Sequence, residues 1–168
     1  MSLSMYEASV PTLSRMLDNL RGILSKGAAH AEAHKLDPAA LTGFRLYPDM
    51  FPLSRQVQIA ADMAKGCAAR LAGVEPPSYE DKETTFAELI ERIEKTSAFV
   101  KSFASTQFDG SEDREIVIKG RNGDMRFSGK QYLLHFVLPN VHFHVATTYN
   151  ILRHNGVVLG KPDFIGGV

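Results

Sequence analysis

Histidine is the side chain in this sequence best suited to acid–base or metal chemistry near neutral pH, because its ordinary pKa lies near 6.5. The chain has 168 residues and six histidines. They fall in two stretches, and their positions are His30, His34, His135, His142, His144 and His154. The single cysteine, Cys67, supplies no Cys-x-x-Cys metal motif. The histidine clusters are therefore the first candidates for a chemical site.

Helical spacing separates His144 from the other histidines. In the last predicted helix, the most continuous apolar face carries Val137, Asn140, Val141, His144, Thr148, Ile151 and Leu152. Asn140 and His144 are thus predicted at core positions one helical turn apart. A buried imidazole without a partner costs about 1–3 kcal/mol, so a metal, a carboxylate or a neighbouring side chain must satisfy it. A hydrogen-bonded neighbour is the more frequent arrangement.

The second predicted helix offers Gln56 as that partner. Gln56 lies on one row with Ala60, Met63 and Cys67, at the margin of the apolar stripe. Its amide can hydrogen-bond His144 or, less well, ligate a cation through its oxygen. Asp62 falls off this row and is expected to be exposed or paired with Lys65, and Cys67 is expected to be a buried, inert thiol.

The other five histidines have simpler interpretations. His30 and His34 have the i, i+4 spacing that can chelate zinc, but they are predicted at an exposed helix end. His135 and His142 are expected on a solvated or subunit-facing surface. His154 lies in the last turn of its helix, where a cation interacts favourably with the helix dipole. No Gly-x-Ser-x-Gly motif, phosphate-binding glycine loop or dinucleotide fingerprint occurs.

Four amphipathic helices are predicted to position these residues. They cover about 4–34, 52–71, 85–100 and 128–155. The first helix has an alternative start at Pro11. In the last helix, Pro139 should kink the helix or divide its first turns from the rest. Residues 114–128 alternate in hydrophobicity around the turn pair Asn122–Gly123, which predicts a short hairpin. The fold class is therefore all-α: a four-helix bundle with a β-hairpin between helices three and four.

Composition limits the functional classes. With 19 basic and 19 acidic side chains the net charge is zero, which argues against a general nucleic-acid binder. No apolar run approaches the roughly 20 residues that cross a bilayer, and the first residues do not resemble a signal peptide. We expect a cytoplasmic protein with one domain, 1–168, whose tail at 157–168 is irregular.

Five segments carry a resemblance to a known family. They are residues 47–53 (YPDMFPL), 56–58 (QVQ), 139–144 (PNVHFH), 151–156 (ILRHNG) and 160–164 (GKPDF). On these segments the chain resembles an uncharacterised bacterial domain-of-unknown-function family, grouped with the DinB/YfiT-like metalloenzyme superfamily. That resemblance implies a DinB-like four-helix bundle, often a homodimer, and, if the chain is catalytic, transfer of a small thiol or related group with His144 as ligand or base.

The resemblance also implies where a metal such as zinc or nickel would bind. The usual superfamily site resembles one histidine from helix two and a His-x-x-x-His pair on helix four. His144 matches the last of these, whereas Asn140 and Gln56 occupy the other two places, and amide oxygens are poorer ligands for zinc or nickel than imidazole. The sequence thus predicts a polar pocket of Gln56, Asn140 and His144 that binds a small molecule or a divalent metal through His144, as in a degenerate metal-dependent transferase. The alternative is a non-catalytic stress or interaction protein in which these residues only fix helix packing.

Overall fold

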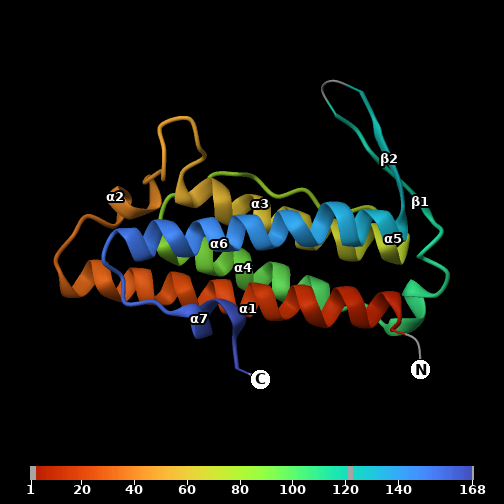
Figure 1. Ribbon diagram of the computed structural model, residues 1–168, viewed down its shortest axis with the longest axis horizontal. Coiled ribbons are helices and arrows are strands. Elements are labelled where there is room, and N and C mark those ends of the chain that lie inside the picture. The colour runs from red at the N-terminus through yellow and green to blue at the C-terminus, as the bar shows by residue number, and fades with distance from the viewer. Residues whose placement is uncertain (1–2, 121–122, 168) are drawn as a thin grey trace.

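Four long helices form the body of the molecule. In the computed structural model, which describes residues 3–120 and 123–167, these are α1 (Met5–Ala33), α3 (Leu53–Ala72), α4 (Phe86–Lys101) and α6 (Leu138–His154). They lie lengthwise beside one another (Figure 1). Their apolar stripes are buried. The predicted all-α four-helix bundle is confirmed.

The helix starts follow from local capping. Ser4 and Glu7 form a capping box at the start of α1, and Thr85 and Glu88 form another at the start of α4, where the third helix was predicted to begin. The alternative start of the first helix at Pro11 is wrong, because the Ser4 cap begins the helix earlier and Pro11 lies inside α1.

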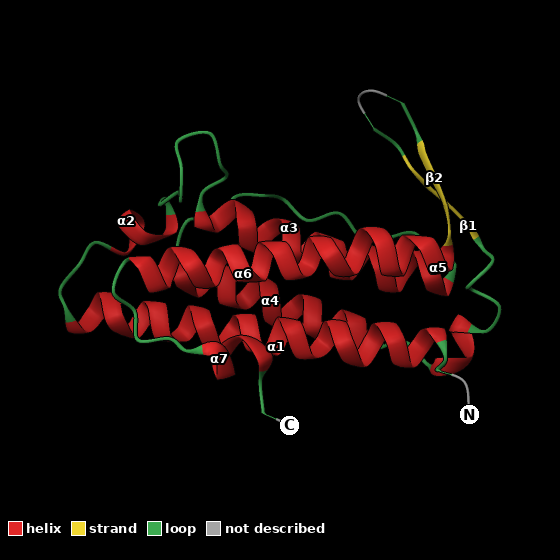
Figure 2. Ribbon diagram, viewed as in Figure 1, coloured by secondary structure: helices red, strands yellow, loops and turns green. Residues whose placement is uncertain are grey.

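The predicted hairpin is also present, and Figure 2 shows it projecting from one end of the bundle. After α4 and a 3-10 turn, η1 (Ser105–Phe108), strand β1 (Glu115–Ile118) pairs antiparallel with β2 (Met125–Ser128). Gly123 of the predicted turn has φ 115°, which favours glycine, whereas Asn122 lies outside the described residues.

The last long helix is interrupted near Pro139, as predicted. A short α5 (Gly129–Gln131), begun by a capping box of Ser128 and Gln131, leads into a π-helical segment, η2 (Tyr132–Val137). Regular α6 begins directly afterwards with Pro139 in its first turn. Proline removes one backbone donor from the helical ladder, so the change of hydrogen-bonding pattern next to it has a local cause.

Two short helices complete the structure. α2 (Pro38–Thr42) lies between α1 and α3, and α7 (Lys161–Ile165) lies in the tail. The prediction of an irregular tail is wrong for α7, where Pro162 occupies the first turn and Asp163 accepts a hydrogen bond from the Gly160 N–H (2.8 Å). The Asp163 carboxylate also pairs with Lys26 of α1 at 2.7 Å, which ties the tail to the bundle.

Small residues on α3 bring it close to its neighbours. Five alanines of this helix are fully buried, namely Ala60, Ala61, Ala64, Ala68 and Ala69. α3 packs against α6, α4 and α1. This packing sets Gln56 of α3 opposite His144 of α6. Among the described residues, no helix is both long and apolar enough to cross a membrane.

Candidate functional site

Gln56 and His144 meet in the interior of the bundle. His144 Nδ1 lies 2.6 Å from Gln56 Oε1, and the two residues are 7% and 1% exposed. The Gln56 side-chain amide donates its own hydrogen bond to the Phe51 carbonyl oxygen at 3.0 Å. The structure therefore brings together two of the three predicted pocket residues, in the hydrogen bond that the helical phase suggested.

Among the described residues, no hydrogen bond links Asn140 to Gln56 or His144. Its Nδ2 donates instead to the Phe136 carbonyl oxygen, one turn earlier in the same helix, at 2.6 Å. Asn140 is only half-buried. Short amide side chains often bond their own helix backbone in this way. Helical phase predicted a core position for Asn140, whereas the structure leaves this residue half-buried with a partner in its own helix backbone.

The hydrogen bonds also define the chemical state of His144. Since the Gln56 amide nitrogen donates to Phe51, its oxygen faces His144, and Nδ1 must be the ring nitrogen that carries hydrogen. Burial, assisted by the positive charge of Arg55, lowers the pKa of His144 below its ordinary value. The lowered pKa favours the neutral imidazole at pH 7, with the lone pair on Nε2.

Nε2 is the open atom of this ring. Within the described part of the chain it takes part in no hydrogen bond, and it is not among the fully buried polar atoms that lack a partner. It therefore retains contact with solvent. Phe143 packs its ring edge-on against the imidazole, with centroids 5.2 Å apart, and is itself 56% exposed.

The donor set does not fit a zinc or nickel ion. His144 is its only imidazole, the Gln56 amide oxygen already accepts the hydrogen bond from His144 Nδ1, and the Asn140 amide bonds the backbone of its own helix. Across residues 3–120 and 123–167, no three His, Cys, Asp or Glu side chains are grouped to hold a metal. Zinc sites use three or four imidazole, thiolate or carboxylate ligands, so one imidazole is insufficient.

The remaining histidines lie outside this site. The rings of His30 and His34 stack with centroids 4.1 Å apart, but His34 Nδ1 bonds the His30 carbonyl oxygen at 2.9 Å. His142 Nδ1 is 2.7 Å from the carbonyl oxygen of Leu138 in its own helix. His135 is exposed, as predicted, and His154 is exposed in the last turn of α6.

Sequence reasoning missed a buried ionic cluster centred on Arg92 of α4. The Arg92 guanidinium, whose side chain is 2% exposed, contacts Asp62 (3.0 Å), Asp81 (2.9 Å) and Glu83 (2.9 Å). Asp62 also pairs with the buried Lys65 at 3.0 Å, as predicted. The one available signal was the position of Arg92 beside Leu89 on the inner side of α4.

This fold and site define a DinB-like four-helix bundle with a reduced polar centre. A family model described as Domain of unknown function (DUF1993) matches residues 5–165. The chain is similar to a DinB family member protein from Shewanella denitrificans, whose crystal structure at 1.83 Å gives a TM-score of 0.91 at 39% identity, covering 98% of this chain and 93% of that one. The chain therefore belongs to the DUF1993 family. No curated protein matches it.

Proposed function

We propose that this chain is a cytoplasmic, homodimeric DinB-like protein that binds a small hydrogen-bond donor, such as a thiol, at Nε2 of His144 without a transition metal. One observation carries the proposal: the 2.6 Å contact between His144 Nδ1 and Gln56 Oε1 in the bundle core. It fixes the ring orientation and tautomer, so the accepting nitrogen is prepared before a ligand arrives. Such preorganisation is what a binding or general-base histidine requires.

The chemistry of the ligand follows from the state of the ring. A neutral imidazole accepts a hydrogen bond from a thiol or hydroxyl, whereas an imidazolium cannot. Burial disfavours the imidazolium of His144, and Arg55 adds positive charge beside it. The Arg55 guanidinium is itself paired with Asp81. A small thiol is the ligand class most consistent with both the ring and the superfamily resemblance.

The test is NMR of the histidine side-chain nitrogens in ¹⁵N-labelled protein, with L-cysteine under reducing conditions as the probe and L-serine as the oxygen analogue. We expect the Nε2 signal of His144 to move on addition of L-cysteine. His144→Ala should lack this signal, which assigns it to His144, and the movement should persist in the control His135→Ala, which removes an exposed histidine close by in sequence. An unchanged Nε2 signal would refute thiol binding here.

A weakly bound divalent metal at His144 is the second candidate. The observation in its favour is the Nδ1–H hydrogen bond to an amide oxygen, since metal-binding histidines commonly hold their other nitrogen in this way. Metal analysis of untagged protein separates the candidates. One metal ion per chain that is lost in His144→Ala would favour the metal, and metal-free protein that still responds to L-cysteine would favour the proposal.

The non-catalytic alternative is that the Gln56–His144 pair only sets how α3 packs on α6. In that case replacing both side chains by leucine changes the stability of the protein, and the wild type shows no response to L-cysteine. The NMR titration distinguishes these two possibilities, because a purely structural histidine shows no movement at Nε2 with either amino acid.

The homodimer is proposed from the family resemblance and from exposed aromatic side chains near the same site. Tyr47 and Phe51, in the segment before α3, are 66% and 53% exposed, and Phe143 of α6 is 56% exposed. Light scattering after gel filtration should give twice the chain mass of 18.5 kDa. Phe143→Ser should shift the protein toward the monomer mass, and a wild-type monomer would rule the dimer out.

A further inference from the structure

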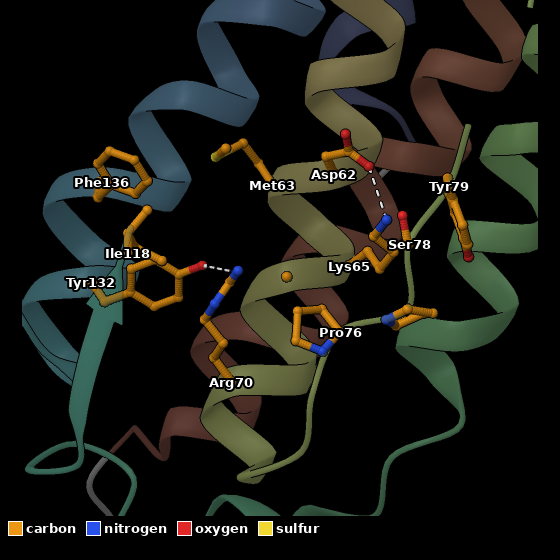
Figure 3. A pocket seen from close by; sticks show the side chains of 12 residues that line it. Asp62, Met63, Lys65, Arg70, Pro76, Ser78, Tyr79, Ile118, Tyr132 and Phe136 are labelled. Atoms are coloured by element: carbon orange, nitrogen blue, oxygen red, sulfur yellow. Dashed lines mark hydrogen bonds and ion pairs between the residues drawn. The ribbon is translucent and has the colours of Figure 1, made fainter. Parts of the chain in front are cut away.

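A cavity of about 280 Å³ lies on a different part of α3 from Gln56. It is bounded by α3, by the extended segment before α4, and by the first turns of the last long helix (Figure 3). Gly66 on its floor is ten residues beyond Gln56, which corresponds to roughly 15 Å along a helix. The volume is close to the lower end of the range for small-molecule sites, which begins near 300 Å³.

Arg70 provides an uncompensated positive charge at this cavity. Its Nη1 donates to the Tyr132 hydroxyl at 3.0 Å, and within the described ranges its side chain forms no other hydrogen bond and no ion pair. A guanidinium has five N–H donors. Most of the donors of this half-buried side chain therefore remain available to a ligand.

The neighbouring charges do not neutralise Arg70, because they neutralise one another. Lys65 pairs with Asp62, which is shared with Arg92, and Arg92 also binds Asp81 and Glu83. The ammonium of Lys65 additionally lies 3.7 Å from the centre of the Tyr79 ring. This cluster has its own counterions, so the positive charge at the other end of the cavity belongs to Arg70.

Tyr132 adds a second donor next to the guanidinium. Its oxygen accepts the hydrogen bond from Arg70, and no acceptor for its own O–H is found among the described residues. Burial, more than any other cause, raises the pKa of Tyr132 to about 12, so the hydroxyl keeps its hydrogen at neutral pH. Two donors thus meet at one point on the cavity wall.

Gly66 makes room for this arrangement. A Cβ atom at position 66 would overlap Arg70 Nη1 and would lie 3.7 Å from the Tyr132 hydroxyl oxygen. Glycine in the middle of a helix costs about 0.5–1 kcal/mol relative to alanine. Helix stability therefore does not explain glycine at position 66, whereas the space that the Arg70 guanidinium needs does explain it.

From these contacts we infer that the cavity binds a small organic carboxylate, with its anionic group on Arg70 and Tyr132 and its apolar part against Met63, Ile118 and Phe136. The guanidinium fork matches a carboxylate, and the hydroxyl supplies a further donor. Because apolar side chains also line the cavity, we expect an organic carboxylate and not an inorganic anion. This site is independent of the proposed ligand of His144.

The experiment is a titration of the full-length protein followed by ¹H–¹⁵N NMR, with benzoate as the probe, benzamide as its neutral analogue and inorganic phosphate as a bare anion. We expect benzoate to move the signals of Gly66 and of the Arg70 side chain. Benzamide and phosphate should bind more weakly. Loss of one charge-assisted hydrogen-bond partner should weaken benzoate by at least about tenfold in Arg70→Gln.

Two further variants separate binding from folding. Gly66→Ala should leave the melting temperature unchanged or higher, because the atoms nearest to the added methyl belong to the flexible end of Arg70, yet it should abolish the benzoate response. Arg153→Gln, an exposed arginine on α6, is the matched control and should bind as wild type does. The inference is overturned if benzoate causes no shift, if benzamide or phosphate binds equally well, or if Arg70→Gln binds like Arg153→Gln.

Discussion

Replacing Gln56 by leucine should destabilise the protein through the histidine that it leaves behind. Gln56→Leu removes the acceptor of His144 Nδ1–H and the donor to the Phe51 carbonyl oxygen, in a region where Gln56 is 1% exposed. An unpartnered buried donor costs about 1–3 kcal/mol and an ordinary hydrogen bond about 0.5–1.5 kcal/mol. The expected loss is therefore about 2–4 kcal/mol, or roughly 4–16 °C in Tm for a domain of this size.

A double-mutant cycle tests the reasoning behind that number. Urea denaturation of wild type, Gln56→Leu, His144→Leu and the double variant should show that the double variant loses less stability than the sum of the singles, with a coupling of about 1 kcal/mol or more. The reason is that the double variant buries no unpartnered ring nitrogen. Additive effects, or a loss below about 0.5 kcal/mol in Gln56→Leu, would show that the 2.6 Å contact does not matter in solution.

Three further predictions concern the elements around the site. Arg92→Met should cost about 2–3 kcal/mol in urea denaturation, because Glu83 loses its cation while Asp62 and Asp81 keep Lys65 and Arg55; a loss below about 1 kcal/mol would contradict this. Backbone N–H groups of Thr84 and Thr85 lower the pKa of Glu88 to about 2, so its contribution is present above pH 4.5 and is lost as the pH falls toward 2. Glu88→Gln should weaken the dependence of the melting temperature on pH between pH 4.5 and 2. The same pH dependence in wild type and variant would show that the Glu88 carboxylate does not stabilise the helix start. Gly73→Ala should destabilise by about 1 kcal/mol because φ is 77°, whereas Gly22→Ala, with open space at its Cβ, should stabilise slightly; equal effects on the two melting temperatures would refute the backbone argument.

The helices were predictable because their signals are local. A polar cap followed three residues later by Glu or Gln marks the starts at Ser4, Thr85 and Ser128. Apolar periodicity then determines which face is buried, and this was sufficient to place Gln56 opposite His144. Helix α7 was missed because its five residues are too few for periodicity, and it is held by an ion pair between residues 137 positions apart.

The parts of the site that sequence could not supply depend on contacts between irregular segments and helices. Segment 74–84 has no periodicity, so nothing indicated that Asp81 and Glu83 would meet Arg92 of α4. Arg70 and Tyr132 are likewise brought together only by the packing of α3 against η2. Periodicity predicted the helical face of Asn140, but it could not predict that this side chain bonds the backbone of its own helix.

The central claim is that the polar centre of this DinB-like bundle works through a neutral histidine and not through a transition metal. The most direct measurement is the zinc and nickel content of untagged protein, by inductively coupled plasma mass spectrometry, after incubation with each ion and dialysis. We predict far less than one ion per chain, with no difference between wild type and His144→Ala. One tightly held ion per wild-type chain that disappears in His144→Ala would contradict the account.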